Sequence, residues 1–182
     1  MKAIATALDG VLILEPRVFE DARGCFFESW NAHTFAELTG IAAEFVQDNH
    51  SLSHRGVLRG LHYQLPPAAQ GKLVRVVQGA VFDVVVDLRR GSSTFGRWLG
   101  IELSAANRRE LWIPPGCAHG FLSLADDTVT LYKTTAGYSP RHERCIRWDD
   151  PALAIAWPLA AAPLLSPRDA EGLALADAEV FP

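Results

Sequence analysis

The sequence predicts an all-β fold, in the form of a jelly-roll β-sandwich with a few short peripheral helices. Short apolar and β-branched runs recur along the chain, and turn residues separate them about every 8–12 positions. The chain also lacks the G-x-G-x-x-G fingerprint and the alternating strand and helix pattern of a dinucleotide-binding α/β fold. Its 182 residues contain no internal repeat, low-complexity segment or linker, so we expect one domain over residues 1–182.

The first third of the chain is expected to form strands and one helix. Strands are predicted in VLILEPRVF and CFFESW, which DARG joins, and again in EFVQDNHS and GVLRGLHYQ. Between these pairs of strands, NAHTFAELTG is predicted to be a helix. Asn31 can cap the start of this helix, and Gly40 can end it.

The rest of the chain is expected to supply most of the sandwich. The run KLVRVVQGAVFDVVVDLR is predicted to form a β-hairpin with Gln78-Gly79 near its turn. Further strands are predicted in GRWLGIELS, ELWIPP, HGFLSLA, TVTLYKTT and CIRW. The segment from Asp150 onward is rich in alanine and proline, so one or two short helices at most are expected there.

Composition limits the classes of function. The formal net charge of −4 argues against broad nucleic-acid binding, although a local basic cluster could still hold a small anion. No apolar run approaches the roughly 20 residues that cross a bilayer, and the start lacks the long apolar region of a signal peptide. The three cysteines have no C-x-x-C spacing, which is typical of free thiols in a reducing compartment. We therefore expect a cytoplasmic protein with no membrane or nucleic-acid partner.

The run GVLRGLHYQ places Arg59 and His62 three residues apart in a predicted strand. Side chains alternate between the faces of a regular strand, so these two should point to opposite sides. Gly60 lies between them and permits a β-bulge, which would turn both side chains toward one cavity. His62 alone could equally be a hydrogen-bonded core histidine. Lys72 and the polar run QDN at 47–49 favour the cavity.

The run IPPGCAHGF contains P-x-G-x-x-H from Pro114 to His119, which resembles the second motif of the cupin superfamily. In many cupins this histidine binds a metal, and a partner motif supplies H-x-H and a later glutamate. Here the equivalent place of the partner motif reads HYQ, starting at His62, so its second histidine is absent. A transition-metal site usually needs three or four ligands, so the two histidines that remain are too few. We therefore expect no metal cofactor.

Other candidates have a structural and a functional interpretation each. Tyr132 and Tyr138 could simply pack with satisfied hydroxyl groups, or Tyr132 could donate a proton in a pocket. Arg168 and Asp169, in LLSPRDAEG, could belong to a solvated loop or a helix cap. If Asp169 reached His62, it would orient the imidazole and raise its basicity.

Six stretches together resemble the dTDP-4-dehydrorhamnose 3,5-epimerase family. They are DARGCFFESW, FVQDNHSLSHRGVLRGLHYQ, GKLVRVVQGAVFDVVVDLRRGSSTFGRW, LWIPPGCAHGF, YKTTAGYSP and LSPRD, in the order of the family. The resemblance implies a cupin-type jelly roll, usually a homodimer, that acts without a cofactor. It implies epimerisation at C3 and C5 of dTDP-4-dehydro-6-deoxy-D-glucose to dTDP-4-dehydro-L-rhamnose, in dTDP-L-rhamnose biosynthesis.

The same resemblance implies roles for individual residues. His62 matches the family's catalytic base and Asp169 its partner. Tyr132 matches the proposed acid, and Lys72 the lysine near the keto oxygen of the sugar. Tyr138 matches the residue that stacks on thymine. The positions that match substrate contacts are Arg23, Phe26, Glu28, Gln47, Asn49, Arg59, His119, Tyr138, Glu143 and Arg168. The segment that carries the first three is thought to reach the partner subunit's site in this family.

Three alternatives stay open at this point. The first is an epimerase of the same fold that inverts only C3 or only C5 of a dTDP-4-keto-6-deoxyhexose in a secondary-metabolite pathway. The second is a metal-dependent cupin enzyme, and the third is a non-catalytic cupin that binds sugar nucleotides. The third would not need the whole set of His62, Tyr132, Lys72 and Asp169. The resemblance gives no role to the three cysteines or to His50, His54 and His142.

Overall fold

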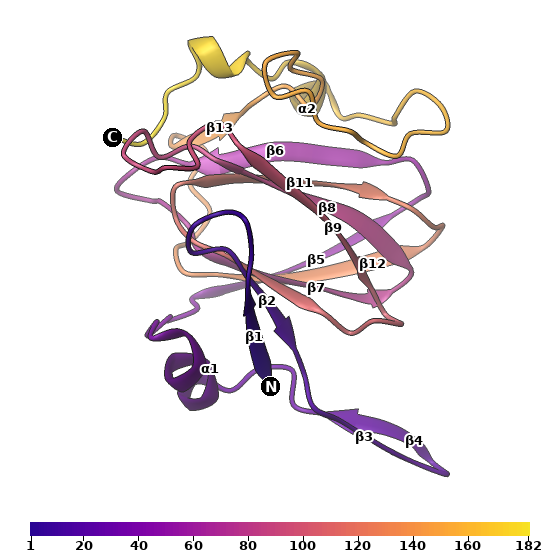
Figure 1. The fold of residues 1–182 in the computed structure, drawn as a ribbon. Coiled ribbons are helices and arrows are strands. Elements are labelled where there is room, and N and C mark those ends of the chain that lie inside the picture. The colour runs from indigo at the N-terminus through magenta and orange to yellow at the C-terminus, as the bar shows by residue number, and fades with distance from the viewer.

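The computed structural model describes all residues 1–182, and two antiparallel β-sheets packed face to face form its body (Figure 1). The six-stranded sheet contains, in spatial order, β1 (Lys2–Ala5), β2 (Leu12–Glu15), β10 (Glu110–Ile113), β7 (Lys72–Gln78), β12 (Thr128–Thr134) and β5 (Gln47–Ser53). The five-stranded sheet contains β13 (Glu143–Cys145), β6 (Leu58–Gln64), β11 (Cys117–Ser123), β8 (Ala80–Asp87) and β9 (Trp98–Ser104). The predicted all-β jelly roll is confirmed.

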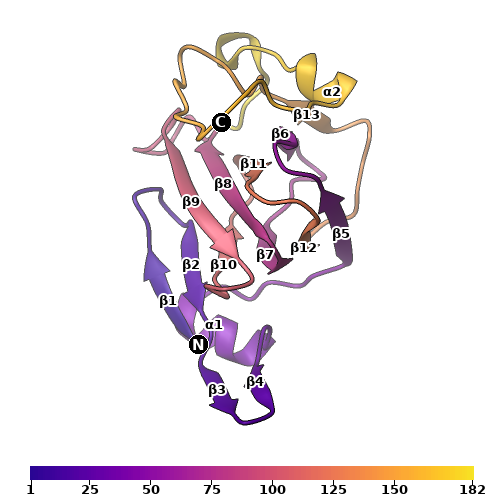
Figure 2. The same cartoon turned by 90° about the vertical axis from the view of Figure 1, so that its right-hand side faces the viewer.

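Smaller elements lie outside these sheets. A separate hairpin, β3 (Val18–Asp21) and β4 (Gly24–Phe27), projects away from the body in both views (Figures 1 and 2). The helices are α1 (Ala32–Thr39), α2 (Pro167–Ala170) and the 3-10 turn η1 (Leu175–Asp177). None of these helices has the length and apolar character that a membrane crossing requires.

The main core lies between the two sheets. Alternate residues of each strand point inward, as the two-residue period of a strand requires. From the six-stranded sheet, Val74 and Leu111 are fully buried, and Val81 and Val85 meet them from the opposite sheet. The core fills one part of the interior, and the remaining part is left open for a site.

The C-terminal segment covers the outer face of the five-stranded sheet, where it is drawn in orange and yellow (Figure 1). Leu61 and Val86 point to this face and are fully buried with Leu153 and Phe181 from the C-terminal segment. Isolated bridges tie the segment to the sheet, for example between residues 146 and 173. The alanine- and proline-rich tail is therefore part of the packed structure, and this packing fixes where α2 lies.

The predicted helix is confirmed with its two ends. The side chain of Asn31 accepts hydrogen bonds from the backbone N–H groups of His33 and Thr34, and Gly40 ends the helix with a φ of 72°. Phe35 is fully buried, with its ring centroid 5.3 Å from that of Trp112 on the outer face of the six-stranded sheet.

The prediction of a hairpin around Gln78-Gly79 is wrong. β7 pairs with β10 and β12, whereas β8 pairs with β11 and β9, so the chain passes from one sheet to the other at Gly79. Both strands are buried on two faces and carry nearly continuous apolar runs. Such runs do not indicate which neighbour a strand pairs with, and Gly79, with a φ of 74°, suits a crossover as well as a hairpin turn. The strand β1 was not among the predicted strands.

The predicted bulge in β6 is confirmed. His119 lies opposite His62 and Phe121 lies opposite Arg59, so two residues of β6 face one residue of β11. Gly60 has a φ of 115°, a conformation that disfavours any side chain. The extra residue reverses the alternation, and both Arg59 and His62 line the interior cavity.

Candidate active site

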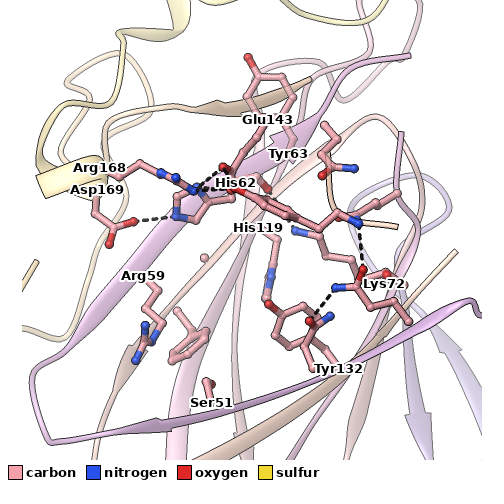
Figure 3. A pocket seen from close by; sticks show the side chains of 18 of the residues that line it. Ser51, Arg59, His62, Tyr63, Lys72, His119, Tyr132, Glu143, Arg168 and Asp169 are labelled. Carbon is pink, nitrogen blue, oxygen red and sulfur yellow. Dashed lines mark hydrogen bonds and ion pairs between the residues drawn. The ribbon is translucent and has the colours of Figure 1, made fainter. Parts of the chain in front are cut away.

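A cavity of about 470 Å³ opens between the two sheets, beside the apolar core (Figure 3). Residues of six strands (β5, β6, β7, β11, β12 and β13) line it, together with the start of α2 and the loop before β13. The lining side chains on these strands are mostly polar, in contrast to the valines and leucines that fill the rest of the interior. Polar side chains that converge on one hollow are typical of a ligand site.

A histidine and a carboxylate from distant parts of the chain meet in this cavity. His62 Nε2 lies 2.7 Å from Asp169 Oδ1, although the two residues are 107 positions apart in the sequence. Asp169 is buried, and it also accepts hydrogen bonds from the N–H of Gly60 at 2.9 Å and the hydroxyl of Ser166 at 2.6 Å. We call His62 and Asp169 the dyad.

The electrostatics of the dyad keep its carboxylate ionised. Burial alone would raise the pKa of Asp169, but the hydrogen bonds from His62, Ser166 and the N–H of Gly60 outweigh burial and lower the pKa to about 2. An ionised carboxylate only accepts hydrogen bonds, so it favours the tautomer in which the hydrogen of His62 is on Nε2. The other ring nitrogen, Nδ1, makes no hydrogen bond within the chain.

The helix α2 holds Asp169 in place. The hydroxyl of Ser166 accepts a hydrogen bond from the N–H of Asp169, and the carboxylate accepts one from the N–H of Ser166, which is a capping box. The carboxylate of Asp169 therefore acts as a helix cap and also contacts His62, so it does both of the things that the sequence presented as alternatives. Ser166 was not among the predicted site residues, although the spacing S-P-x-D was a usable signal.

Lys72 enters the same cavity from β7 and is almost fully buried. Its Nζ donates a hydrogen bond to the backbone carbonyl of His62 at 3.3 Å. Burial lowers the pKa of Lys72 to about 8, despite the opposing effect of the negative charges on Asp83 and Glu143. The ammonium group is therefore a poorly solvated cation, and a new negative charge beside it would be strongly stabilised.

Tyr132 faces the cavity from β12, in the sheet opposite the strand of His62. Burial raises the pKa of its phenol, the charge of Arg59 partly offsets this, and the charge of Glu143 adds to it. The hydroxyl is therefore protonated at neutral pH and can donate a hydrogen. Two groups capable of proton transfer thus stand on opposite walls of one chamber (Figure 3).

The mouth of the cavity carries a cation, a carboxylate and an exposed aromatic ring. Arg168 forms an ion pair with Glu143 and donates to the hydroxyl of Tyr138 at 3.1 Å, and that hydroxyl donates to Glu143 at 2.9 Å. The Tyr138 ring is 48% exposed, which leaves one face available for stacking. On the other side, Arg59 donates to the side chain of Ser53 at 3.2 Å.

Three further contacts fix the polar lining of the cavity. His119 is buried, and its Nε2 lies 2.9 Å from a carboxylate oxygen of Asp83, a residue that sequence reasoning missed. The side-chain amide of Gln47 donates to Asn49 at 2.8 Å, and its oxygen accepts from the N–H of Tyr138. Asp83 carried no motif, and only the pairing of β8 with β11 reveals it.

Gln64 stands where cupins place a second metal-binding histidine. In the structure its side-chain oxygen accepts from the N–H of Ser139 at 2.8 Å, and its amide donates to the carbonyl of Gly137 at 3.1 Å. It therefore holds the loop that carries Tyr138 against the cavity.

Comparison with known proteins assigns this chain to a family. The family model for dTDP-4-dehydrorhamnose 3,5-epimerase matches residues 5–177. The chain belongs to the dTDP-4-dehydrorhamnose 3,5-epimerase family. It is 60% identical, over the full length of both chains, to the dTDP-4-dehydrorhamnose 3,5-epimerase of Pseudomonas aeruginosa. The chain is thus an isomerase of the epimerase type, and the recognition made from six motifs is confirmed.

Solved structures agree with the family and the fold. A dTDP-6-deoxy-D-glucose-3,5-epimerase from Legionella pneumophila, in complex with dTDP-4-keto-L-rhamnose, is 49% identical with a TM-score of 0.94, covering 98% of this chain and 94% of that one. A 3′-monoepimerase from Streptomyces bikiniensis, in complex with dTDP-quinovose, is 39% identical with a TM-score of 0.90, covering 97% and 88%. Double and single epimerases therefore share this fold.

Three residues predicted for the epimerase site are not brought to this cavity. Arg23 lies in the turn of the projecting hairpin, where it pairs with Asp21 at 2.6 Å. Phe26 in β4 is 71% exposed, and Glu28 after β4 accepts a hydrogen bond from the side chain of Asn31. None of the three lines the cavity of its own chain.

Proposed function

We propose that the chain inverts C3 and C5 of dTDP-4-dehydro-6-deoxy-D-glucose to give dTDP-4-dehydro-L-rhamnose, without a cofactor. One observation carries this proposal: the dyad and Tyr132 face each other across one cavity. Inversion of a carbon needs a base on one face of the sugar and an acid on the other, and opposite sheets supply such a pair.

The first step is removal of a carbon-bound hydrogen. The keto group at C4 acidifies the hydrogens on C3 and C5, because the electrons left behind spread onto the keto oxygen. His62 takes the proton on its unprotonated ring nitrogen, while Asp169 holds the other nitrogen and stabilises the imidazolium. A positioned base or acid typically contributes about 10²–10⁴-fold to the rate.

Proton transfer by His62 leaves a negative charge on the enolate oxygen, and that charge needs stabilisation of its own. Lys72 presents a poorly solvated ammonium group to the cavity, and a preorganised donor of this kind contributes roughly 3–4 kcal/mol. Tyr132 then returns a proton from the opposite face, which inverts the carbon. A second round at the other carbon completes the reaction, with no net change of redox state.

The nucleotide part of the substrate is assigned to the mouth of the cavity. Arg59 and Arg168 supply cations suited to a diphosphate, since guanidinium groups bind phosphate oxygens in pairs. Tyr138 offers its exposed face to the thymine ring. This remote anchor holds the reacting ring in register between base and acid.

The projecting hairpin suggests a shared site. We assign Arg23, Phe26 and Glu28 to the cavity of a partner subunit in a homodimer, because none of them lines the cavity of its own chain and the hairpin projects from the body (Figure 1). The exposed ring of Phe26 supports this, since a large apolar side chain at a hairpin end is typical of a contact surface. A cytoplasmic location fits the three free cysteines.

Single epimerisation is the second candidate, because a 3′-monoepimerase shares this fold at 39% identity. The higher identity of 60% to a 3,5-epimerase favours two inversions. NMR of the product formed from the purified chain and dTDP-4-dehydro-6-deoxy-D-glucose distinguishes them. Two inverted centres are expected. A product inverted at only one of the two carbons, C3 or C5, would replace the proposal by the single epimerase, and an unchanged substrate would reject both.

A further inference from the structure

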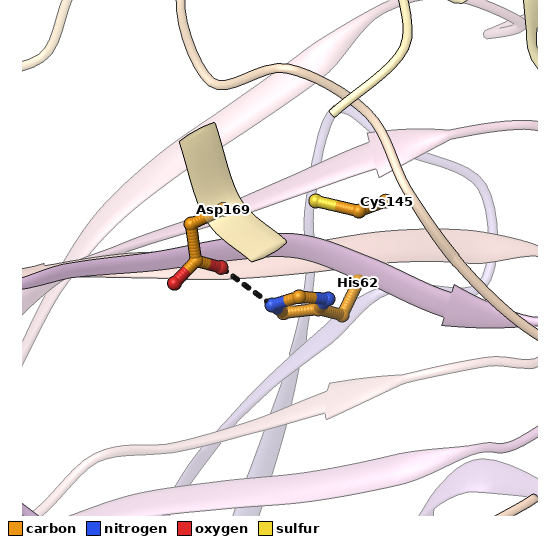
Figure 4. Close-up of side chains that lie close together, drawn as sticks. All are labelled: His62, Cys145 and Asp169. Atoms are coloured by element: carbon orange, nitrogen blue, oxygen red, sulfur yellow. Dashed lines mark hydrogen bonds and ion pairs between the residues drawn. The ribbon is translucent and has the colours of Figure 1, made fainter. Parts of the chain in front are cut away.

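A cysteine thiol lies beside the dyad. Cys145 ends β13, and its partner across the strand pair is His62 in β6. One ring nitrogen of His62, one carboxylate oxygen of Asp169 and the sulfur of Cys145 all lie within 4.8 Å of one another (Figure 4). The three groups come from two strands and α2, and none of the epimerisation steps uses the thiol.

The spacing of these three atoms suits a metal ion. Three atoms no more than 4.8 Å apart share a point that is at most about 2.8 Å from each of them, whereas zinc bonds to nitrogen, oxygen and sulfur are about 2.0–2.3 Å long. Each ligand would therefore move inward by roughly half an ångström. A water molecule from the adjacent cavity would complete four ligands, because His62 also lines that cavity.

The charges also favour a divalent cation. Asp169 is ionised, and loss of the thiol proton would place a second negative charge beside it. A divalent cation bound at Nε2 takes the place of the hydrogen there, which moves to Nδ1 of the same ring. It neutralises both negative charges and releases the thiol proton to water.

We propose that His62, Cys145 and Asp169 form an inhibitory binding site for a borderline-soft divalent cation such as Zn²⁺. The ligand set differs from the His62 and His119 pair that a metal-dependent cupin would use. The ion occupies the imidazole and the carboxylate together, so the dyad can no longer remove a proton. Only this inhibitory consequence rests on the proposed function, because binding itself needs no substrate.

Binding is tested with Co²⁺, which replaces Zn²⁺ at nitrogen and sulfur sites and gives a thiolate charge-transfer absorption. The full-length wild-type chain titrated with CoCl₂ should show this absorption, as should Cys25→Ser, which removes an exposed thiol that is not one of the three proposed ligands. Cys145→Ser and Cys145→Ala should both lack it, with circular dichroism confirming that they are folded. Persistence of the absorption in folded Cys145 variants would overturn the proposal.

Inhibition is tested with ZnCl₂ during turnover. Zn²⁺ should inhibit the wild type reversibly, with activity restored by EDTA, and Mg²⁺ should not, because it prefers oxygen ligands. Cys145→Ser should keep its basal activity and need at least about tenfold more Zn²⁺ for half inhibition. Equal sensitivity of wild type and Cys145→Ser to Zn²⁺ would overturn the proposal. An inactive wild type that still binds Co²⁺ would reject the proposed function instead.

Discussion

At the scale of single residues, Asp169 combines two tasks that the sequence presents as alternatives. Its Oδ1 meets His62 and the N–H of Gly60, whereas its Oδ2 meets Ser166 in the cap of α2. Because these hydrogen bonds hold the pKa of Asp169 at about 2, the carboxylate stays ionised through the neutral range. The imidazole therefore has a fixed orientation and a fixed tautomer.

Asp169→Asn separates the two tasks. The amide is nearly the same size, but it carries no charge to stabilise the imidazolium, so kcat is expected to fall by about 10²–10⁴-fold with the fold intact. Ser166→Ala is the matched control, because it removes the cap hydroxyl and should lower stability by about 1 kcal/mol with a smaller loss of kcat. Steady-state kinetics and urea unfolding measure both effects. An Asp169→Asn variant that loses only stability would make Asp169 a structural cap.

The pH dependence of catalysis is expected to report on Lys72. Burial lowers the pKa of Lys72 to about 8, so the ammonium is present below pH 8 and is lost as the pH rises through it. The value of kcat/KM, which reports on the free enzyme, should therefore decline above about pH 8. In Lys72→Arg the alkaline decline should disappear from any residual activity, because arginine keeps its proton. If the activity of Lys72→Arg still declined above about pH 8, the decline would have to come from the titration of another group.

At the scale of elements, the bulge in β6 is the device that brings two functional side chains to one face. A Cβ at Gly60 would lie 2.6 Å from Cα of Gly120 and 2.7 Å from the carbonyl oxygen of His119. The positive φ of Gly60 adds backbone strain for any other residue. The two strands approach so closely that only glycine fits.

Gly60→Ala is therefore expected to destabilise the protein by more than about 3 kcal/mol, from the sum of strain and overpacking. A β6 that relaxed to accept the methyl group would also shift His62 and lower kcat. Gly91→Ala is the control, because a Cβ there meets no atom within 4 Å, and it should be nearly neutral. Chemical unfolding of the two variants beside the wild type measures the difference. Equal stability of all three would show that the bulge is not constrained by this contact.

Some elements of the fold could be predicted from the sequence, and others could not. Helix α1 was predictable with both ends, because Asn31 and Gly40 act locally. The bulge was predictable as a possibility, because Gly60 breaks an otherwise regular alternation. The sequence did not predict that β7 and β8 belong to different sheets, because strands buried on both faces lose the polar and apolar alternation that reveals their faces.

The site residues also divide into those that a local sequence pattern predicts and those that only the folded structure brings together. The motifs around His62 and His119 named residues that do line the cavity. The contacts of Asp83 and Gln64 depend on strand pairing and loop docking, which leave no local pattern in the sequence. The position of Cys145 beside the dyad depends on the pairing of β13 with β6, so spacing along the chain could not predict it.

At the scale of the whole molecule, the β3–β4 hairpin is the part that a single chain leaves unexplained. It projects from the body in both views (Figures 1 and 2). The side chains of Arg23 and Phe26 on this hairpin are exposed. In a two-fold symmetric dimer each hairpin would make the same contact with the other chain. A site completed in this way would make activity depend on the dimer.

Complementation between two inactive variants tests this sharing. Arg23→Ala and His62→Asn are each expected to be strongly impaired alone. In co-expressed mixed dimers, one site would combine both changes and the other would have neither. With equal random pairing, half of the dimers are mixed and hold one intact site in two, so about a quarter of the wild-type activity should return. No recovery in purified mixed dimers would place Arg23 outside the partner's site.

The central claim, that base and acid act from opposite sheets on one sugar ring, is tested most directly by solvent deuterium exchange. Wild type, His62→Asn and Tyr132→Phe are incubated with dTDP-4-dehydro-6-deoxy-D-glucose in D₂O, and NMR follows deuterium at C3 and C5. His62→Asn is expected to abolish exchange at both carbons, whereas Tyr132→Phe should retain initial exchange and lose inversion. Undiminished exchange in His62→Asn, or equal loss of exchange and inversion in Tyr132→Phe, would contradict the assignment.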